Sequence, residues 1–181
     1  MPWHNEPHRW RQSGGTLTLR TDPHTDFWQA TGYGFVRDNG HFLGEPATGD
    51  FRAEVRVAGQ YRDLYDQAGL MVRLDAQNWL KCGIEFVEGV QHVSAVATRE
   101  FSDWSVIPLP DNPPAIHLRL DRKGDGLEVY FSVDGTRFTL ARLAYFPPVP
   151  EVLVGPMACS PEGEGFEVEF SGLQVGPLPA S

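Results

Sequence analysis

The sequence predicts an all-β protein, built as a two-layer antiparallel β-sandwich or jelly roll. Polar and apolar residues alternate with a period of two in many short segments, as half-buried strands require. Turns that contain glycine separate these segments, and no segment shows a comparable helical period. At 181 residues the chain is long enough to bury a substantial core, so we expect a single domain over residues 1–181.

The clearest strand is Asp50–Val57, in which an apolar residue follows every polar one. The same alternation predicts six further strands, which are Gln67–Leu74, Trp79–Val87, Gln91–Thr98, Ala115–Asp121, Leu127–Val133 and Phe166–Phe170. Tight turns are expected at 38–40, 88–89, 123–126 and 134–135, where Gly, Asn and Asp accept positive φ. Segments 108–114 and 147–150 are rich in proline, which cannot donate to a strand ladder, and are expected to be longer connections.

The side chains that point away from the core combine single charges with large apolar groups. In Trp79–Val87 the alternation directs Leu80, Cys82 and Ile84 inward and Lys81 and Glu85 outward. Other strands add Gln67, Arg73, Thr98, Arg119, Glu128 and Tyr130 to the outward set. We expect these side chains to share one sheet face, whose aromatic platforms and polar groups suit a sugar ring. The alternative is an ordinary solvated face.

Lys81 is the first indication of a site, because the chain has only two lysines and this one lies in the middle of a predicted strand. The other, Lys123, lies in a turn. A chain that otherwise uses arginine suggests, at Lys81, a need for a compact ammonium rather than a planar guanidinium. Chance placement of a lysine on a solvated face is the alternative.

Two further segments supply candidate ligand contacts. The aromatic segment 25–43 is expected to form a shaped loop with a short hairpin; Trp28 and His41 are candidates if it walls a pocket, whereas otherwise its rings plug the end of the sandwich. Segment 102–105 contains Asp103 and Trp104. It is expected either to form a corner that bonds its own backbone or to contact a ligand.

Composition and motifs exclude several classes of function. Acidic residues outnumber basic ones by 24 to 15, giving a net charge of −9, so nucleic acid is not an expected partner. No apolar stretch is typical of a signal peptide or a membrane span, which predicts a cytoplasmic protein without a membrane partner. No metal or cofactor is expected, since zinc, phosphate-loop and dinucleotide patterns are absent. Cys82 and Cys159 are expected to be reduced and mostly buried.

Several ordered motifs together resemble a known family. They are Tyr65-Asp66-Gln67-Ala68-Gly69-Leu70-Met71-Val72-Arg73, Trp79-Leu80-Lys81, Gly83-Ile84-Glu85, Ser102-Asp103-Trp104-Ser105 and Cys159-Ser160-Pro161. The chain resembles, over nearly its whole length, the domain-of-unknown-function family numbered 1349, the regulator-of-enolase-like proteins. The resemblance implies a concanavalin-like sandwich with a concave face, similar in fold to lectins and glucanases. It implies no agreed activity, so the catalytic residues, if there are any, are unknown.

The sequence therefore predicts non-catalytic binding of a carbohydrate or sugar-like metabolite in the concave face. A regulatory protein-interaction domain of carbohydrate metabolism is the main alternative, and it would present a broad patch with an apolar centre. A glycoside hydrolase is the weaker alternative. Glucanases of this architecture carry a Glu-x-Asp-x-Glu strand, which this chain lacks, and only Glu85 and Glu128 are candidates to face each other across strands.

Overall fold

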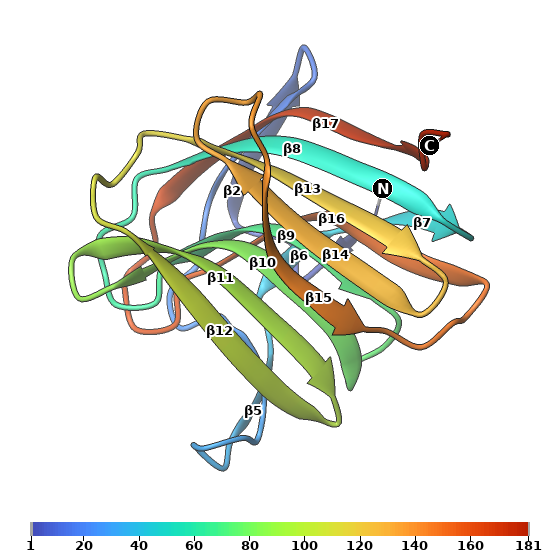
Figure 1. The fold of residues 1–181 in the computed structure, drawn as a ribbon. Coiled ribbons are helices and arrows are strands. Elements are labelled where there is room, and N and C mark those ends of the chain that lie inside the picture. The colour runs from blue at the N-terminus through green and yellow to red at the C-terminus, as the bar shows by residue number, and fades with distance from the viewer. Residues whose placement is uncertain (1, 181) are drawn as a thin grey trace.

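Two antiparallel sheets packed face to face make up the computed structural model, which describes residues 2–180 (Figure 1). Sheet A has the order β1 (Trp3–His4), β6 (His41–Leu43), β16 (Glu151–Cys159), β9 (Gln67–Arg73), β10 (Asn78–Val87), β11 (Val90–Arg99) and β12 (Phe101–Leu109), with β7 (Glu45–Thr48) also paired to β16. Sheet B has the order β15 (Thr139–Tyr145), β14 (Gly126–Ser132), β13 (Ile116–Lys123), β8 (Phe51–Gly59), β17 (Glu167–Pro177), β3 (Thr16–Arg20) and β2 (Arg9–Ser13). A separate hairpin joins β4 (Phe27–Gln29) to β5 (Val36–Asp38).

This architecture confirms the predicted two-layer antiparallel sandwich. Each strand expected from alternation is present, and the turns at 88–89 and 134–135 have the expected positive φ at glycine. Within residues 2–180 there is no helix, and so none that is long and apolar enough to cross a membrane.

The alternation missed strands whose two faces have similar surroundings. Strand β16 is buried on both faces along most of its length, so its sequence does not alternate. One face, with Val152 and Val154, packs into the core between the sheets, and apolar side chains around Met157 and Cys159 cover the other. Strand β12 is an edge strand, mostly exposed on both faces, and it contains segment 102–105. The expectation of a corner at 102–105 was therefore wrong.

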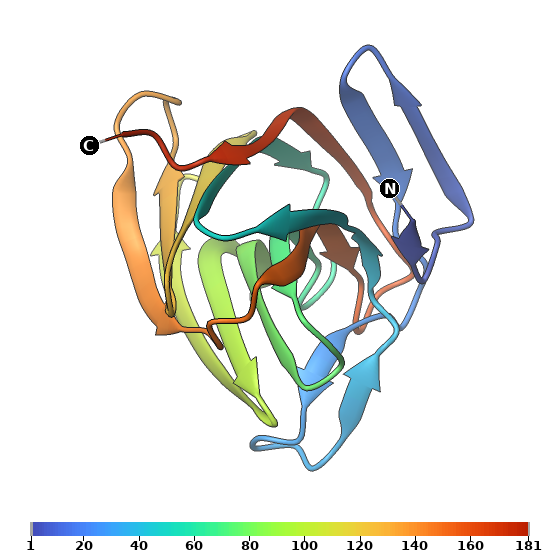
Figure 2. The same ribbon diagram turned by 90° about the vertical axis from the view of Figure 1, so that its right-hand side faces the viewer.

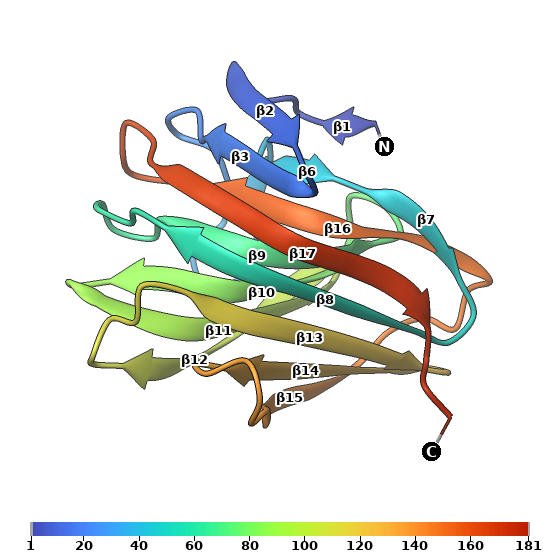
Figure 3. The same ribbon diagram turned by 90° about the horizontal axis from the view of Figure 1, so that it is seen from above.

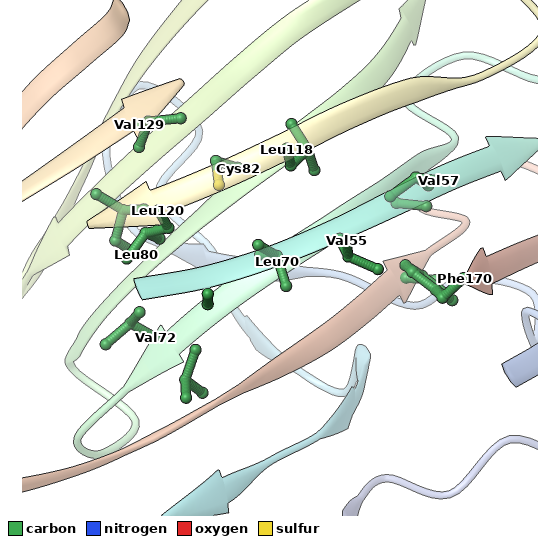
Figure 4. Packing of buried hydrophobic residues seen from close by; sticks show 14 of the residues in the cluster. Val55, Val57, Leu70, Val72, Leu80, Cys82, Leu118, Leu120, Val129 and Phe170 are labelled. Atoms are coloured by element: carbon green, nitrogen blue, oxygen red, sulfur yellow. The ribbon is translucent and has the colours of Figure 1, made fainter. Parts of the chain in front are cut away.

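The main core lies between the two sheets, with residues from β8, β9, β10 and β13 in contact (Figure 4). Seen from above, the strands of sheet B lie over those of sheet A (Figure 3). Leu80, Cys82 and Ile84 point into this core as the alternation predicted, and Cys82 is a buried free thiol. Leu74, at the end of a predicted strand, is instead exposed because β9 ends at Arg73.

A second apolar cluster covers the opposite, outer face of sheet A. It consists of Phe27, Trp28, Phe42, Met71, Trp79, Val96, Met157 and Cys159. The β4–β5 hairpin supplies the first two of these, and it projects from the sandwich on the side of sheet A away from sheet B (Figures 1 and 2). The β4–β5 hairpin therefore packs against part of the outer face of sheet A, and this face is not an open solvated surface.

Two glycines lie opposite each other at the centre of that face. Gly69 and Gly83 are cross-strand partners in β9 and β10, and Gly83 separates Lys81 from Glu85 along its strand. A Cβ at Gly69 would lie 1.9 Å from the backbone oxygen of Cys82, so the close backbone approach requires glycine. Along β10, Gly83 consequently places no side chain between Lys81 and Glu85 on the outer face.

Candidate functional site

A cavity of about 390 Å³ opens over the outer face of sheet A, beside the β4–β5 hairpin. Its volume falls within the range of small-molecule sites. The lining residues are His24, Asp26, Trp28, Tyr33, Phe35, Arg37, Tyr65, Gln67, Lys81, Glu85, Trp104, Pro161 and Glu162. The floor comes from sheet A, and the walls come from the hairpin and from two loops that precede β9 and follow β16.

Lys81 connects the floor to the hairpin. Its side chain is buried, and its Nζ donates hydrogen bonds to Asp26 Oδ1 at 3.0 Å and to the carbonyl oxygen of Phe27 at 2.7 Å. Burial is the largest single effect and would lower the pKa of this lysine, but Asp26, Cys159 and Glu85 together outweigh it, so the pKa is raised and the ammonium stays charged. The unusual mid-strand lysine therefore anchors the hairpin, and it also lines the cavity.

Glu85 is the second buried charge of the floor. Its Oε2 accepts hydrogen bonds from Ser94 Oγ at 2.7 Å and from Trp104 Nε1 at 2.9 Å. Within residues 2–180, no lysine, arginine or histidine nitrogen lies within 4.0 Å of this carboxylate, and Oε1 accepts no hydrogen bond. Burial raises the pKa of Glu85, an effect only partly offset by Lys81 and by the Ser94 and Trp104 hydrogen bonds.

Replacing Glu85 by glutamine is expected to stabilise the protein at neutral pH. A carboxyl group whose pKa is raised in the folded state contributes stability below its ordinary value of 4.5 and loses that contribution as the pH rises through the folded pKa. Glutamine keeps an acceptor oxygen for Ser94 and Trp104 without the buried charge. Urea unfolding at a series of pH values should show that the free energy of unfolding of the variant, relative to that of the parent, increases as the pH rises. A variant that is less stable at pH 7 than at pH 4, relative to the parent, would contradict this.

Aromatic rings form two walls of the cavity. On the hairpin side, Trp28 and Tyr33 meet edge to face at 5.5 Å between ring centroids, and Tyr33 and Phe35 stack at 5.5 Å. On the other side, Tyr65 and Trp104 meet edge to face at 6.3 Å. These rings enclose the polar floor with apolar surface, as ligand-binding pockets commonly do.

The loop that carries Tyr65 is fixed by a buried aspartate. Asp66 is fully buried; its Oδ1 accepts a hydrogen bond from Ser160 Oγ at 2.6 Å, and its Oδ2 accepts two from backbone N–H groups of the same loop. Gln67 follows it and donates from Nε2 to the carbonyl oxygen of Tyr65 at 3.1 Å. The contact with Ser160 also positions the segment that brings Glu162 to the rim.

The structure brings together five of the residues that the sequence singled out. These are Trp28, Gln67, Lys81, Glu85 and Trp104, all of which line the cavity. Lys81 and Glu85 make no direct ion pair, as their four-residue spacing along one strand predicted.

Three other candidates lie near the same face but have internal partners. His41 is buried, with Nε2 accepting from the backbone N–H of Asp22 at 2.9 Å, and burial lowers its pKa. Arg73 makes two hydrogen bonds with Asp38, at 2.7 and 2.9 Å. Thr98 bonds Ser102 at 2.8 Å. None of the three lines the cavity, so the structure does not bring them together with Lys81 and Glu85.

The remaining four candidates do not share the face at all. Arg119, Glu128 and Tyr130 belong to β13 and β14 of sheet B, where Arg119 stacks on Tyr130 at 4.0 Å. Asp103 is next to Trp104 in β12 and therefore points to the opposite side, where it pairs with Arg142. The expectation that all these residues share one sheet face was therefore wrong, and Glu85 does not face Glu128. Alternation with a period of two predicts which side of its strand a residue lies on, but it does not predict which sheet contains the strand.

Sequence reasoning missed several residues of the walls. Asp26, Tyr33 and Phe35 lie in the aromatic segment 25–43, which was recognised as a shaped hairpin but represented only by Trp28 and His41. Tyr65 stands at the start of one of the motifs on which the family resemblance rests, and its positive φ of 67° marks a specific turn. That motif was the available signal for Tyr65.

Comparison of the sequence and of the structure with known proteins identifies the family of this chain and similar folds. The protein family described as "Protein of unknown function (DUF1349)" matches residues 3–178. A Saccharomyces cerevisiae protein named "Regulation of enolase protein 1" is 47% identical over 169 residues, which cover 93% of this chain and 85% of that protein. The crystal structure of a functionally unknown protein from Saccharomyces cerevisiae superimposes with a TM-score of 0.95 at 45% identity, covering 99% of this chain and 97% of the other.

A more distant structure shares the fold alone. Carbohydrate binding module CBM66 from Bacillus subtilis superimposes with a TM-score of 0.62 at 15% identity, covering 96% of this chain and 94% of the module. The match of the family model over nearly the whole chain, together with the identity to the yeast protein, establishes the family. This chain is a member of the family described as a protein of unknown function, DUF1349.

Proposed function

We propose that this protein binds a small carbohydrate or sugar-like metabolite, without catalysis, in the cavity over the outer face of sheet A. The observation that carries the proposal is the combination of a buried polar floor with aromatic walls. Sugars present apolar ring faces and polar edges, so they match rings at the sides and hydrogen-bonding groups below. Glu85 Oε1 has no partner among residues 2–180, and Lys81 has one ammonium hydrogen beyond its two bonds.

The charges of the cavity support binding rather than hydrolysis. A retaining glycosidase needs one carboxylate as nucleophile and a second as acid, both directed at the substrate. Asp26 is occupied by Lys81, which leaves Glu85 as the one buried carboxyl group in the cavity without a cationic partner within 4.0 Å among residues 2–180. The fold shared with a carbohydrate binding module adds support of a general kind.

Thermal unfolding in the presence of neutral monosaccharides, sugar alcohols and sugar acids tests the proposal. A ligand that binds only the folded state raises the midpoint, and the stabilisation grows with the logarithm of one plus the ratio of the ligand concentration to Kd. Trp104→Leu removes a wall and a hydrogen bond to Glu85, so the affinity is expected to fall about tenfold. Trp10→Leu, on β2 of sheet B, is the control and should keep the affinity of the parent. No shift with any of these compounds would contradict the proposal.

A regulatory protein-interaction role is the second candidate, and a separate surface favours it. Edge strands β12 and β15 carry exposed apolar side chains, which include Phe101 and Ile107 on β12 and Leu140, Leu143 and Tyr145 on β15. Arg142 on β15 donates a hydrogen bond to Ser105 on β12 at 2.9 Å, so these two edges lie beside each other. Exposed apolar side chains at neighbouring sheet edges are typical of interaction sites, and the name of the yeast relative points to regulation.

Analytical ultracentrifugation of the protein with enolase from the same source organism tests this second candidate. A complex that Leu143→Ser abolishes, with the sugar response intact, would support it. Sedimentation of two independent species would contradict it.

A further inference from the structure

The carboxylate of Glu85 lacks the partner that a buried charge normally has. Its exposed fraction is 7%, and its two hydrogen-bond donors, Ser94 and Trp104, are both neutral. Buried charges in proteins are usually paired with an opposite charge, because desolvation costs several kcal/mol otherwise. Within residues 2–180 no cationic nitrogen lies within 4.0 Å, although Glu85 lines a cavity.

The other buried charges of the cavity are already balanced. The ammonium of Lys81 is 3.0 Å from Asp26 Oδ1, so this pair contributes no net charge. Arg37 and Glu162 carry opposite charges, and both side chains are exposed at the rim, where water screens them. The interior of the cavity consequently carries one uncompensated negative charge when Glu85 is ionised.

The walls also favour a positive group. Five aromatic rings line the cavity, from Trp28, Tyr33, Phe35, Tyr65 and Trp104. The face of an aromatic ring attracts a cation within about 6 Å, and this attraction grows when the cation is desolvated. One ring already shows it, because the guanidinium of Arg37 lies 4.7 Å from the centroid of the Phe35 ring.

We infer that the ligand of this cavity carries a cationic nitrogen, as an amino sugar does, and that this nitrogen binds at Glu85 between the aromatic walls. The inference rests on the proposed function and narrows it to amine-bearing compounds of sugar size. The ammonium donates to Oε1 of Glu85, which is free to accept, while Ser94 and Trp104 hold Oε2. The hydroxyl groups of the ligand bond Gln67 and the remaining donor of Lys81.

Calorimetric titration with matched pairs of sugars tests the inference. Glucosamine is compared with glucose, and galactosamine with galactose, at about pH 6, where the amine carries its proton. N-acetylglucosamine serves as an uncharged compound with the same substituent position. Charge-assisted hydrogen bonds are roughly twice as strong as neutral ones, so we expect each amino sugar to bind about tenfold more tightly than its neutral partner.

Glu85→Gln should abolish the preference for the amine, so that each amino sugar and its neutral partner bind this variant with equal affinity. Glu169→Gln is the matched control, since its side chain is 48% exposed on sheet B, and the preference should persist there. Equal affinity for amino and neutral sugars, or a preference that survives in Glu85→Gln, would overturn the inference and leave the proposed function standing. Absence of binding by every sugar, charged or neutral, would contradict the proposed function itself.

Discussion

Replacing Leu70 by alanine is expected to lower the free energy of unfolding by about 2 to 5 kcal/mol. Leu70 is fully buried in β9, at the centre of the core between the two sheets (Figure 4). The loss combines the transfer energy of the removed methyl and methylene groups with the cavity that remains, because packed strands on both sides cannot collapse into it. Urea unfolding measures the change.

Arg56→Ala is the control for this measurement. The Arg56 side chain is 42% exposed and lies 3.9 Å from Glu169, so its removal should change stability by no more than about 0.5 kcal/mol. Arg52 is a poorer control although it also alternates outward, because it makes two hydrogen bonds of 2.7 Å with the buried Asp121. Equal losses for Leu70→Ala and Arg56→Ala would show that the core does not lie between the sheets.

Replacing Asp26 by asparagine is expected to lower the free energy of unfolding by about 3 kcal/mol. The change leaves the ammonium of Lys81 buried with no opposite charge in contact, and it weakens the attachment of the hairpin to β10. The double variant Asp26→Asn with Lys81→Met should lose less than the sum of the two single variants, because the unpaired charge is then absent.

The pH dependence of these variants follows from the pKa of Lys81. In the parent the folded pKa is raised above the ordinary value of 10.5, so the stability from the pair is complete below 10.5 and is lost as the pH rises through the folded pKa. In Asp26→Asn burial dominates and the folded pKa falls, so stability should instead increase as the pH rises through that lowered pKa. If Asp26→Asn lowers the free energy of unfolding by less than about 1 kcal/mol, as the loss of a surface ion pair would, the description of Asp26 and Lys81 as a buried pair is contradicted.

Much of the fold was predictable because alternation reports local burial. Segment 50–57 alternates in sequence and in exposure, so β8 and its inward residues followed directly. Strand β16 was not predictable in this way, since both of its faces are covered and its neighbours β6 and β9 are far away in sequence. Pairing between distant strands leaves no periodic trace in a single chain.

The site was predictable where it depends on one strand and not where it depends on tertiary packing. Lys81 and Glu85 lie an odd number of positions from the inward-pointing Leu80, so the alternation predicted that both point outward, and the structure places both at the cavity. Arg119 has the same outward parity but lies in the other sheet, which parity cannot reveal. That Asp26 folds over Lys81 depends on the hairpin packing against sheet A, and no local pattern encodes that contact.

The indole N–H signals of the five tryptophans provide the most direct test of the cavity as a ligand site. In a two-dimensional proton–nitrogen spectrum, titration with glucosamine or glucose should move the signals of Trp28 and Trp104, which line the cavity. The signals of Trp3 and Trp10, which contact each other at the N-terminal strands, should stay in place. Movement of Trp3 and Trp10 with Trp28 and Trp104 unchanged would place any binding elsewhere and contradict the account.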